Sequence, residues 1–294
     1  MNLYLKRTAE DWIIDIAVFV VLAIFCFLCV YPFWYIVVAS LNDGNDMMKG
    51  GVYIWPRVFT LDNYIGFFTQ AAWQTAIQVS VARTVIGAAA TTLFTSLVSY
   101  ALSRRSLMFG NTYRRLFVFS MYVSGGLIPF YFILRLIGLL NSFGVYIFPT
   151  MLNLFFVIVG INFFRTIPDS LFESAWLDGA SEHSIFLRVA LPLSKSYLAT
   201  LTLFSAVGQW NSWLDSTYYV NDKALRPMAY QMMVVINSTA LSSNSNLDLT
   251  DTVRMTVTAT QSTAVVATVL PILCVYPLLQ KYFVQGIMIG SVKE

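Results

Sequence analysis

The side chains most able to do chemistry gather in one polar stretch, residues 168–192, which lies between two long apolar runs. It carries the acids Glu173, Asp178 and Glu182 and the only histidine of the chain, His183. The sequence contains no HExxH motif, no nucleophile paired with a histidine, and no phosphate-binding loop of the form GxxxxGKS or GxxxxGKT. We therefore expect neither catalysis nor ATP binding, and we assign no chemistry to His183. A short polar helix between two apolar runs is instead suited to docking into a groove of another protein.

Local signals predict where this helix begins and ends. Pro168 interrupts the preceding apolar run, so the helix is expected to start beside it. Asp169 or Ser170 can cap the first turn, and Glu173 stands at the capping-box distance from Ser170. Gly179 then ends or bends the helix, because glycine favours a turn over a helix interior.

The predicted helix is amphipathic. We expect Leu171, Ala175 and Ala180 to share the face turned away from water. A second short amphipathic segment, 185–191, leads into Pro192, where the next apolar run begins. The stretch therefore predicts a helix, a bend and a return into an apolar environment.

The composition is that of a membrane protein. Of 294 residues, 57% are hydrophobic and only 11% are charged, against about 25% charged in soluble domains. The mean hydropathy is +0.68. The three cysteines, Cys26, Cys29 and Cys274, all fall inside apolar runs, so they predict neither a disulfide framework nor a metal site.

Six charge-free intervals are long enough to cross a bilayer, for which a helix needs about 20 apolar residues. With the apolar residues beside them, these intervals predict spans at roughly residues 13–39, 73–103, 115–135, 135–165, 195–215 and 254–281, of which the first includes Asp15 and the second includes Arg83. Glycine and proline interrupt the third and fourth intervals at Gly125, Gly126, Pro129 and Pro149. Broken helices are tolerated where they line a cavity, so these two intervals are candidates for a pathway. The sequence predicts an all-α membrane protein with six transmembrane helices in a single domain, residues 1–294.

The placement of Lys and Arg orients the predicted spans. Arginine doublets at 104–105 and 114–115 indicate the cytoplasmic side of the membrane. Both termini and the stretch 168–192 are then cytoplasmic. Two long segments, 41–74 and 217–254, are expected outside. The second is rich in Ser, Asn and Thr, and it is either a solvated connection or a contact surface for an external partner.

The stretch 168–192 resembles the EAA loop of ABC-importer permeases. That signature has Glu-Ala-Ala, then a glycine four residues later, then Ile-x-Leu-Pro; the matching residues are Glu173-Ser174-Ala175, Asp178-Gly179 and Val189-x-Leu191-Pro192. Ser174 replaces an alanine and Val189 replaces the isoleucine, and both changes are small. The resemblance implies a cytoplasmic coupling loop that contacts an ATPase through Glu173, Ser174, Ala175, Asp178, Gly179, Leu191 and Pro192.

Other segments resemble carbohydrate-uptake permeases of the maltose-permease type. They are Leu61-Asp62-Asn63-Tyr64, Tyr100-Ala101-Leu102-Ser103-Arg104, Trp210-Asn211-Ser212-Trp213 and the tail 277–286. The terminal Gly-Ser-Val-Lys is similar to the oligosaccharide branch, and the overall likeness extends to permeases of alginate-oligosaccharide importers. The resemblance covers nearly the whole chain.

This resemblance implies the type I ABC-importer permease fold and a multi-subunit assembly. The expected partners are a second homologous permease, two ATPase subunits, an extracytoplasmic solute-binding protein, an oligosaccharide and membrane lipid, with no nucleic acid. ATP and Mg would be held by the ATPase subunits, and this chain is expected to carry no cofactor and no metal. The location implied is the bacterial cytoplasmic (inner) membrane, crossed several times, with transport by ATP-driven alternating access.

Four residues are candidates for the pathway or for the interface with the second permease: Trp210, Asn211, Trp213 and Arg135. A packed helix face would explain the first three equally well. An acidic, alginate-type sugar would suit positive charge on the route, which Arg83, Arg135 and Arg254 could supply. Arginines that extend from helix ends to the membrane surface are the alternative explanation.

Two other kinds of transport protein remain open at this point. An ion-coupled secondary carrier would need ionisable groups inside the membrane and usually an inverted repeat, and neither is clear in the sequence. A channel subunit is the other alternative. Because membrane acids are nearly absent, the simplest energy source is another polypeptide.

Overall fold

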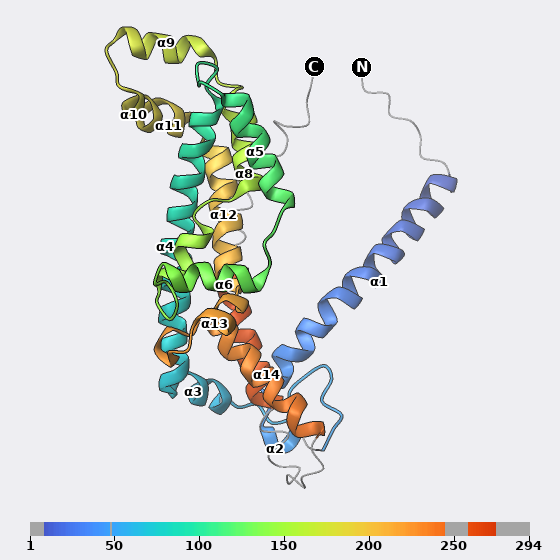
Figure 1. Ribbon diagram of the computed structural model, residues 1–294. Helices are drawn as coiled ribbons and strands as arrows, with labels where there is room; N and C mark the ends of the chain where they lie inside the picture. The colour runs from blue at the N-terminus through green and yellow to red at the C-terminus, as the bar shows by residue number, and fades with distance from the viewer. Residues whose placement is uncertain (1–8, 48, 245–257, 275–294) are drawn as a thin grey trace. The chain divides into compact units, whose positions relative to one another are not determined.

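The computed structural model describes residues 9–47, 49–244 and 258–274. Within them every regular element is a helix, and one isolated β-bridge joins Asn42 to Phe59 (Figure 1). The chain forms two compact units: Met1–Thr69 with Val235–Ala267, and Gln70–Val234 with Thr268–Glu294. The predicted all-α class is confirmed.

The first unit begins with one long apolar helix, α1 (Ala9–Ser40), followed by α2 (Gly44–Met47) and α3 (Asp62–Thr69). The most apolar 18-residue stretch of α1 has a mean hydropathy of 3.1, and none of its residues is buried. A bare helix of this kind is stable where lipid or another protein covers it. It matches the first predicted span, 13–39.

The segment after α1 is tied to that helix by the side chains of one motif. Asn63 donates two hydrogen bonds, to the carbonyl oxygens of Ser40 and Asn42, both at 3.0 Å. The hydroxyls of Tyr64 and Ser40 are 2.8 Å apart. The segment Leu61-Asp62-Asn63-Tyr64 therefore closes the connection onto the end of α1, which is a structural role.

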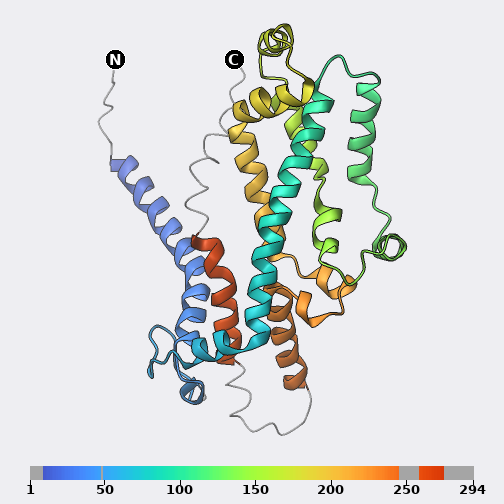
Figure 2. The same cartoon turned by 90° about the vertical axis from the view of Figure 1, so that its left-hand side faces the viewer.

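The second unit is built around α4 (Ala71–Ser103), which packs along α8 and α12. α4 agrees closely with the second predicted span, 73–103. Figure 2 shows it running beside these helices. The other helices are α5 (Gly110–Tyr122), α6 (Leu127–Leu136), α7 (Gly144–Ile147), η1 (Phe148–Thr150), α8 (Leu154–Phe164), α9 (Asp169–Leu177), α10 (Glu182–Ile185), η2 (Phe186–Ala190), α11 (Leu191–Leu193), α12 (Lys195–Asn211), α13 (Leu214–Tyr219) and η3 (Lys223–Leu225).

The third and fourth predicted spans are each two helices rather than one. α5 and α6 meet at 117° across a break that ends at Gly126, whose φ of +82° favours glycine. The α7–η1 segment and α8 meet at 46°. Among the described residues, two helices, α1 and α4, are long and apolar enough to cross a membrane by themselves, and the count rises to four if each bent pair is one span. Six spans and cytoplasmic termini therefore stay predictions.

Threonines of α4 satisfy the backbone at the bend before α8. Thr91 donates to the carbonyl of Thr150 at 3.0 Å, and Thr95 donates to that of Met151 at 3.1 Å. The Thr95 hydroxyl also accepts from the backbone N–H of Asn153 at 3.1 Å. Irregular backbone survives at membrane depth where protein groups satisfy it, so α4 stabilises the bend.

The predicted outer segment 217–254 is largely helical where it is described. α14 runs from Met228 to Asn244, and residues 245–254 lie outside the described residues. A further apolar helix occupies Thr258–Cys274. The side of the membrane on which these residues lie stays a prediction.

Candidate functional site

The predicted helix in the stretch 168–192 is α9, but its start differs from the prediction. Pro168 itself is the N-cap residue, and no side chain caps the helix. Ser170 is therefore already inside the first turn, and its carbonyl accepts a hydrogen bond from the Ser174 hydroxyl at 2.8 Å. The predicted cap by Asp169 or Ser170 with Glu173 is wrong, because the fixed φ of proline starts the helix one or two residues earlier.

The end of α9 confirms the role predicted for Gly179. Its φ of +79° lies in the left-handed region. The N–H of Gly179 donates to the carbonyl of Trp176 at 2.9 Å, and the N–H of Ala180 donates to that of Ala175 at 3.0 Å. These two bonds are the Schellman motif, which satisfies carbonyls at the end of the helix and turns the chain sharply.

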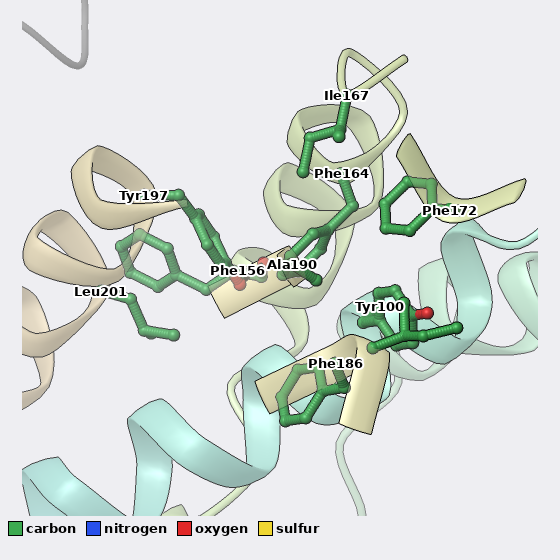
Figure 3. Close-up of a cluster of buried hydrophobic side chains, with 10 residues drawn as sticks. Tyr100, Phe156, Phe164, Ile167, Phe172, Phe186, Ala190, Tyr197 and Leu201 are labelled. Atoms are coloured by element: carbon green, nitrogen blue, oxygen red, sulfur yellow. Dashed lines mark hydrogen bonds between the residues drawn. The ribbon is translucent and has the colours of Figure 1, made fainter. Parts of the chain in front are cut away.

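The buried face of α9 is centred on Phe172, which is 1% exposed. Leu171, expected on this face, is 44% exposed, so that expectation is wrong. Ala175 and Ala180 pack against the buried cluster as predicted. A large aromatic ring contributes more burial than leucine, and the helix is rotated to insert it. Figure 3 shows Phe172 beside Tyr100, whose ring also contacts those of Phe164 and Phe186.

The charged side chain of Arg104, the C-cap residue of α4, covers the outer surface of this cluster. The guanidinium carbon of Arg104 lies 4.3 Å from the ring centroid of Phe172 and 4.9 Å from that of Trp176. Glu182 accepts hydrogen bonds from the Tyr100 hydroxyl and the Trp176 indole, both at 3.1 Å. Cation–π contacts and shared carboxylate bonds thus fix α9 to the end of α4. We call Tyr100, Arg104, Phe172, Trp176 and Glu182 the clamp.

Charged side chains of both signs surround a small pocket beside the clamp. The pocket has a volume of about 200 Å³. Its charged lining consists of Arg104, Arg105, Arg165, Asp169 and Glu173. The arginine doublet predicted at the membrane surface therefore lies next to the glutamate of the coupling motif.

The return from α9 uses a widened helical turn. η2 is a π-helix that joins α10 to α11, and the N–H of Leu191 donates to the carbonyl of Phe186, five residues earlier. Pro192 has no N–H, and its ring crowds the carbonyl four residues before it. A π-turn relieves that crowding. Leu191 and Pro192 thus place the chain at the start of α12.

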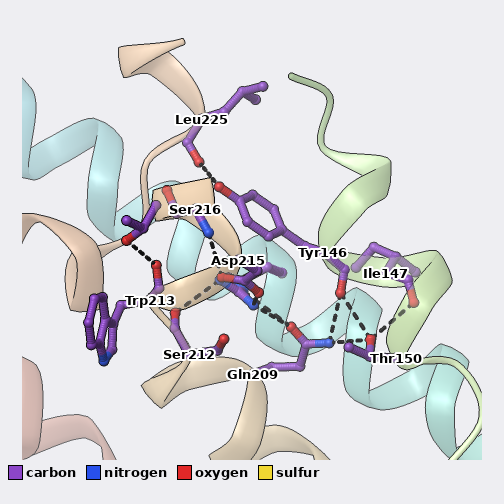
Figure 4. Close-up of polar contacts among 11 residues, drawn as sticks. Tyr146, Ile147, Thr150, Gln209, Ser212, Trp213, Asp215, Ser216 and Leu225 are labelled. Atoms are coloured by element: carbon purple, nitrogen blue, oxygen red, sulfur yellow. Dashed lines mark hydrogen bonds and ion pairs between the residues drawn. The ribbon is translucent and has the colours of Figure 1, made fainter. Parts of the chain in front are cut away.

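A second polar cluster, formed by Arg83, Gln209 and Asp215, connects α4 to the end of α12 and lies outside the stretch 168–192. Arg83 is 0% exposed, and its guanidinium donates to both carboxylate oxygens of Asp215, at 3.2 and 2.5 Å. It also donates to Gln209 Oε1 at 3.0 and 3.1 Å. Gln209 in turn donates to the Tyr146 carbonyl and the Thr150 hydroxyl (Figure 4). The charge of Arg83 is therefore fully compensated inside the protein.

From the sequence, Asp215 marks the end of a span, and Arg83 marks a span end and is a candidate positive charge on the sugar route. An arginine and an aspartate at the limits of two charge-free intervals are a signal for pairing, but the sequence does not say which intervals are neighbours. The alternative in which Arg83 extends to the membrane surface is wrong, because its side chain is buried. Its charge is likewise not free to attract an acidic sugar.

The four residues predicted for the pathway or permease interface have different surroundings. Trp210 is 8% exposed, and its indole donates to the carbonyl of Thr268 at 2.9 Å, which is a packing role. Asn211 is exposed at the end of α12, Trp213 is half-buried, and Arg135 is exposed in the last turn of α6. Arg254 and the tail 277–286 lie outside the described residues.

No protein-family model matches the chain. Among curated proteins, it is 39% identical to "Protein LplC" of Bacillus subtilis over 273 residues, 90% of each chain. It is 36% identical over 285 residues to the "Polygalacturonan/rhamnogalacturonan transport system permease protein YtcP" of the same organism, covering 97% of this chain and 99% of that protein.

A solved structure has the same fold over nearly the whole chain. It belongs to a bacterial ABC transporter involved in the import of the acidic polysaccharide alginate, and the TM-score is 0.85 with 26% identity. The alignment covers 95% of this chain and 99% of the other. The chain belongs to the family of ABC-transporter permeases for sugars, as the EAA-like stretch 168–192 and the segments similar to carbohydrate-uptake permeases together predicted.

Proposed function

We propose that this chain is the permease subunit of a binding-protein-dependent ABC importer for oligosaccharides, and that α9 is the helix through which an ATPase subunit drives it. The observation that carries the proposal is the way α9 is held. Its inner face is fixed by Phe172 and Arg104, whereas Leu177 at its tip is 90% exposed and Glu173 is exposed beside it. A short helix fixed on one side and bare on the other is suited to insertion into a cleft.

The mechanism is alternating access. An ATPase pair that closes on nucleotide would carry α9 with it, and the clamp would pass that displacement to α4. Partners that bind the outward-open state more tightly than the inward-open state supply the driving free energy. Within α9, Glu173, Ser174, Ala175, Asp178 and Gly179 form or end the docking helix, while Leu191 and Pro192 anchor its return.

The assembly proposed contains a second homologous permease, two ATPase subunits and an extracytoplasmic solute-binding protein. ATP and Mg belong to the ATPase subunits, so hydrolysis takes place outside this chain. We place the complex in the bacterial cytoplasmic membrane, with α1 and α4 among several spans. A secondary carrier or channel is not favoured, because the relatives named above include a transport-system permease and an ABC transporter subunit.

The substrate class proposed is an oligosaccharide, with an acidic, alginate-type sugar as the specific expectation. Its support is the neighbour that imports the acidic polysaccharide alginate and the relative named for polygalacturonan and rhamnogalacturonan. Arg83 contributes nothing to this expectation, since Asp215 neutralises it. Arg135, which is exposed, stays a candidate contact.

The experiment is reconstitution of the purified complex in proteoliposomes. We expect uptake of labelled oligosaccharide that requires both ATP and the binding protein, and stronger competition by uronate oligomers than by neutral ones. Uptake by the isolated chain driven by an ion gradient would contradict the proposal. Equal competition by neutral and uronate oligomers would remove the acidic substrate and leave the importer intact.

A further inference from the structure

We propose that a pocket between α4, α8 and α12 binds one sugar residue of the transported oligosaccharide. This inference rests on the proposed function and adds a site to it. The pocket has a volume of about 250 Å³. Its lining combines polar side chains with one aromatic ring, the usual composition of a small-molecule site. The residues used below are Asn153, Phe204, Ser205, Gly208, Ser212 and Asp215.

Hydrogen-bonding groups in the pocket are left available for a ligand. The Ser205 hydroxyl oxygen is buried and has no hydrogen-bond partner within the described chain. A buried polar atom without a partner is costly, and a bound ligand is one way to satisfy it. Asn153 uses its Oδ1 to accept from the N–H of Phe156 at 3.1 Å, which leaves the two N–H donors of its amide.

The acid in the pocket is fixed in place by its partner. Asp215 keeps an 18% exposed side chain while Arg83 holds both of its oxygens. Each carboxylate oxygen can accept more than one hydrogen bond, so Asp215 can still accept from a sugar hydroxyl. Because the ion pair carries no net charge, the pocket recognises hydroxyl groups rather than a carboxylate. Arg83 is accordingly a positioning residue.

One face of α12 gives the pocket its shape. Phe204 and Gly208 are four residues apart in α12 and share that face, and Ser212 follows directly as the C-cap residue. The Phe204 ring is 50% exposed and offers an apolar surface for the C–H face of a sugar ring. A Cβ placed on Gly208 meets nothing within 4 Å, so this glycine opens onto free space. Gly208 therefore leaves room that a larger side chain would fill.

A size series at Gly208 tests the site in the reconstituted complex. Gly208→Ala should retain most of the uptake, Gly208→Val should lower it, and Gly208→Leu should lower it at least tenfold. Assembly of the complex and its ATP hydrolysis without sugar should remain unchanged. Gly66→Leu is the matched control, because a Cβ on this α3 glycine also meets nothing within 4 Å.

A second variant separates binding from mere obstruction. Ser205→Ala removes the unpartnered hydroxyl without adding bulk, and we expect it to raise the KM for uptake several-fold while the maximal rate stays near that of the wild type. The increase in KM should be equal for neutral and uronate oligomers, since the pocket binds hydroxyl groups and both kinds of sugar carry them.

Different experimental outcomes would contradict the sugar site and the proposed function. Wild-type uptake by Gly208→Leu would overturn the sugar site while leaving the importer function standing. Loss of the second permease from the purified Gly208→Leu complex would also overturn the sugar site. The pocket would then be filled by a side chain of the second permease rather than by sugar. If the wild-type complex itself moves no oligosaccharide, the proposed function fails and the sugar site fails with it.

Discussion

Arg83 and Asp215 form a two-pronged ion pair across 132 positions of sequence, with Nη1 3.2 Å from Oδ1 and Nη2 2.5 Å from Oδ2. The pair joins α4 to the segment after α12, and Gln209 completes it. Taking two charges out of water is costly, so each partner depends on the other. The pair therefore adds little net free energy of folding. It still holds α4 against α12, because separating the two side chains would leave two unpaired charges inside the protein.

Removing one partner of this pair should destabilise the permease strongly. Arg83→Ala leaves the Asp215 carboxylate without its counter-ion, at a cost of about 3–5 kcal/mol. We expect the thermal midpoint of the purified complex to fall by roughly 10 °C. Arg83→Met combined with Asp215→Leu removes both charges and should recover most of the loss. A double variant as unstable as Arg83→Ala would show that the charges themselves are needed.

Gly160 should not tolerate even one additional carbon. A Cβ there would overlap the hydroxyl oxygens of Tyr197 and Ser99, which are buried and in contact with each other. The Tyr197 hydroxyl also donates to the Phe156 carbonyl at 2.9 Å, so it cannot move freely. Gly160→Ala should cost about 1–3 kcal/mol through overpacking, measured by thermal unfolding. Gly208→Ala, at an open position, is the control and should leave the midpoint unchanged.

The clamp should control how tightly ATP hydrolysis is linked to uptake. Arg104→Ala removes the guanidinium from the rings of Phe172 and Trp176, where each contact contributes about 0.5–1 kcal/mol. Because α9 would then move more freely against α4, we expect about five to thirty times more ATP hydrolysed per sugar imported, by the summed free energy of the two contacts. Arg104→Lys keeps a cation and should show a smaller change. Unchanged stoichiometry in Arg104→Ala would refute the role of the clamp.

The connection after α1 should be sensitive to acid. Burial of Asp46 raises its pKa, but hydrogen bonds from Asn42 and Arg57 and the charges of Arg57 and Lys49 together hold the pKa below 3.8. A carboxyl with a lowered folded pKa contributes stability above its unfolded pKa and loses it as pH falls through the folded value. We expect proteolysis between residues 42 and 57 to increase below about pH 4. Asp46→Asn should make cleavage independent of pH in that range.

Local signals allowed part of this structure to be predicted, and long-range packing decided the rest. The end of α4 follows from the charge-free interval that stops at Arg104, and the end of α9 follows from Gly179, because both depend on neighbouring residues. Phe172 was missed because the choice between it and Leu171 depends on rings supplied by α4 and η2. The bond between Arg83 and Asp215 was missed for the same reason, since nothing local relates residues 132 positions apart.

The central claim is that α9 transmits the work of ATP to this chain, and Glu173→Lys tests it most directly. This substitution reverses the charge of a side chain on the exposed side of α9, so folding should be unaffected. A second variant, Gly179→Asp, strains the left-handed turn that ends α9. The measurement is ATP-dependent oligosaccharide uptake and ATP hydrolysis by the same proteoliposomes. Loss of uptake with hydrolysis continuing, in a fully assembled and inserted complex, is the predicted result. Uptake close to that of the wild type in both variants would contradict the account.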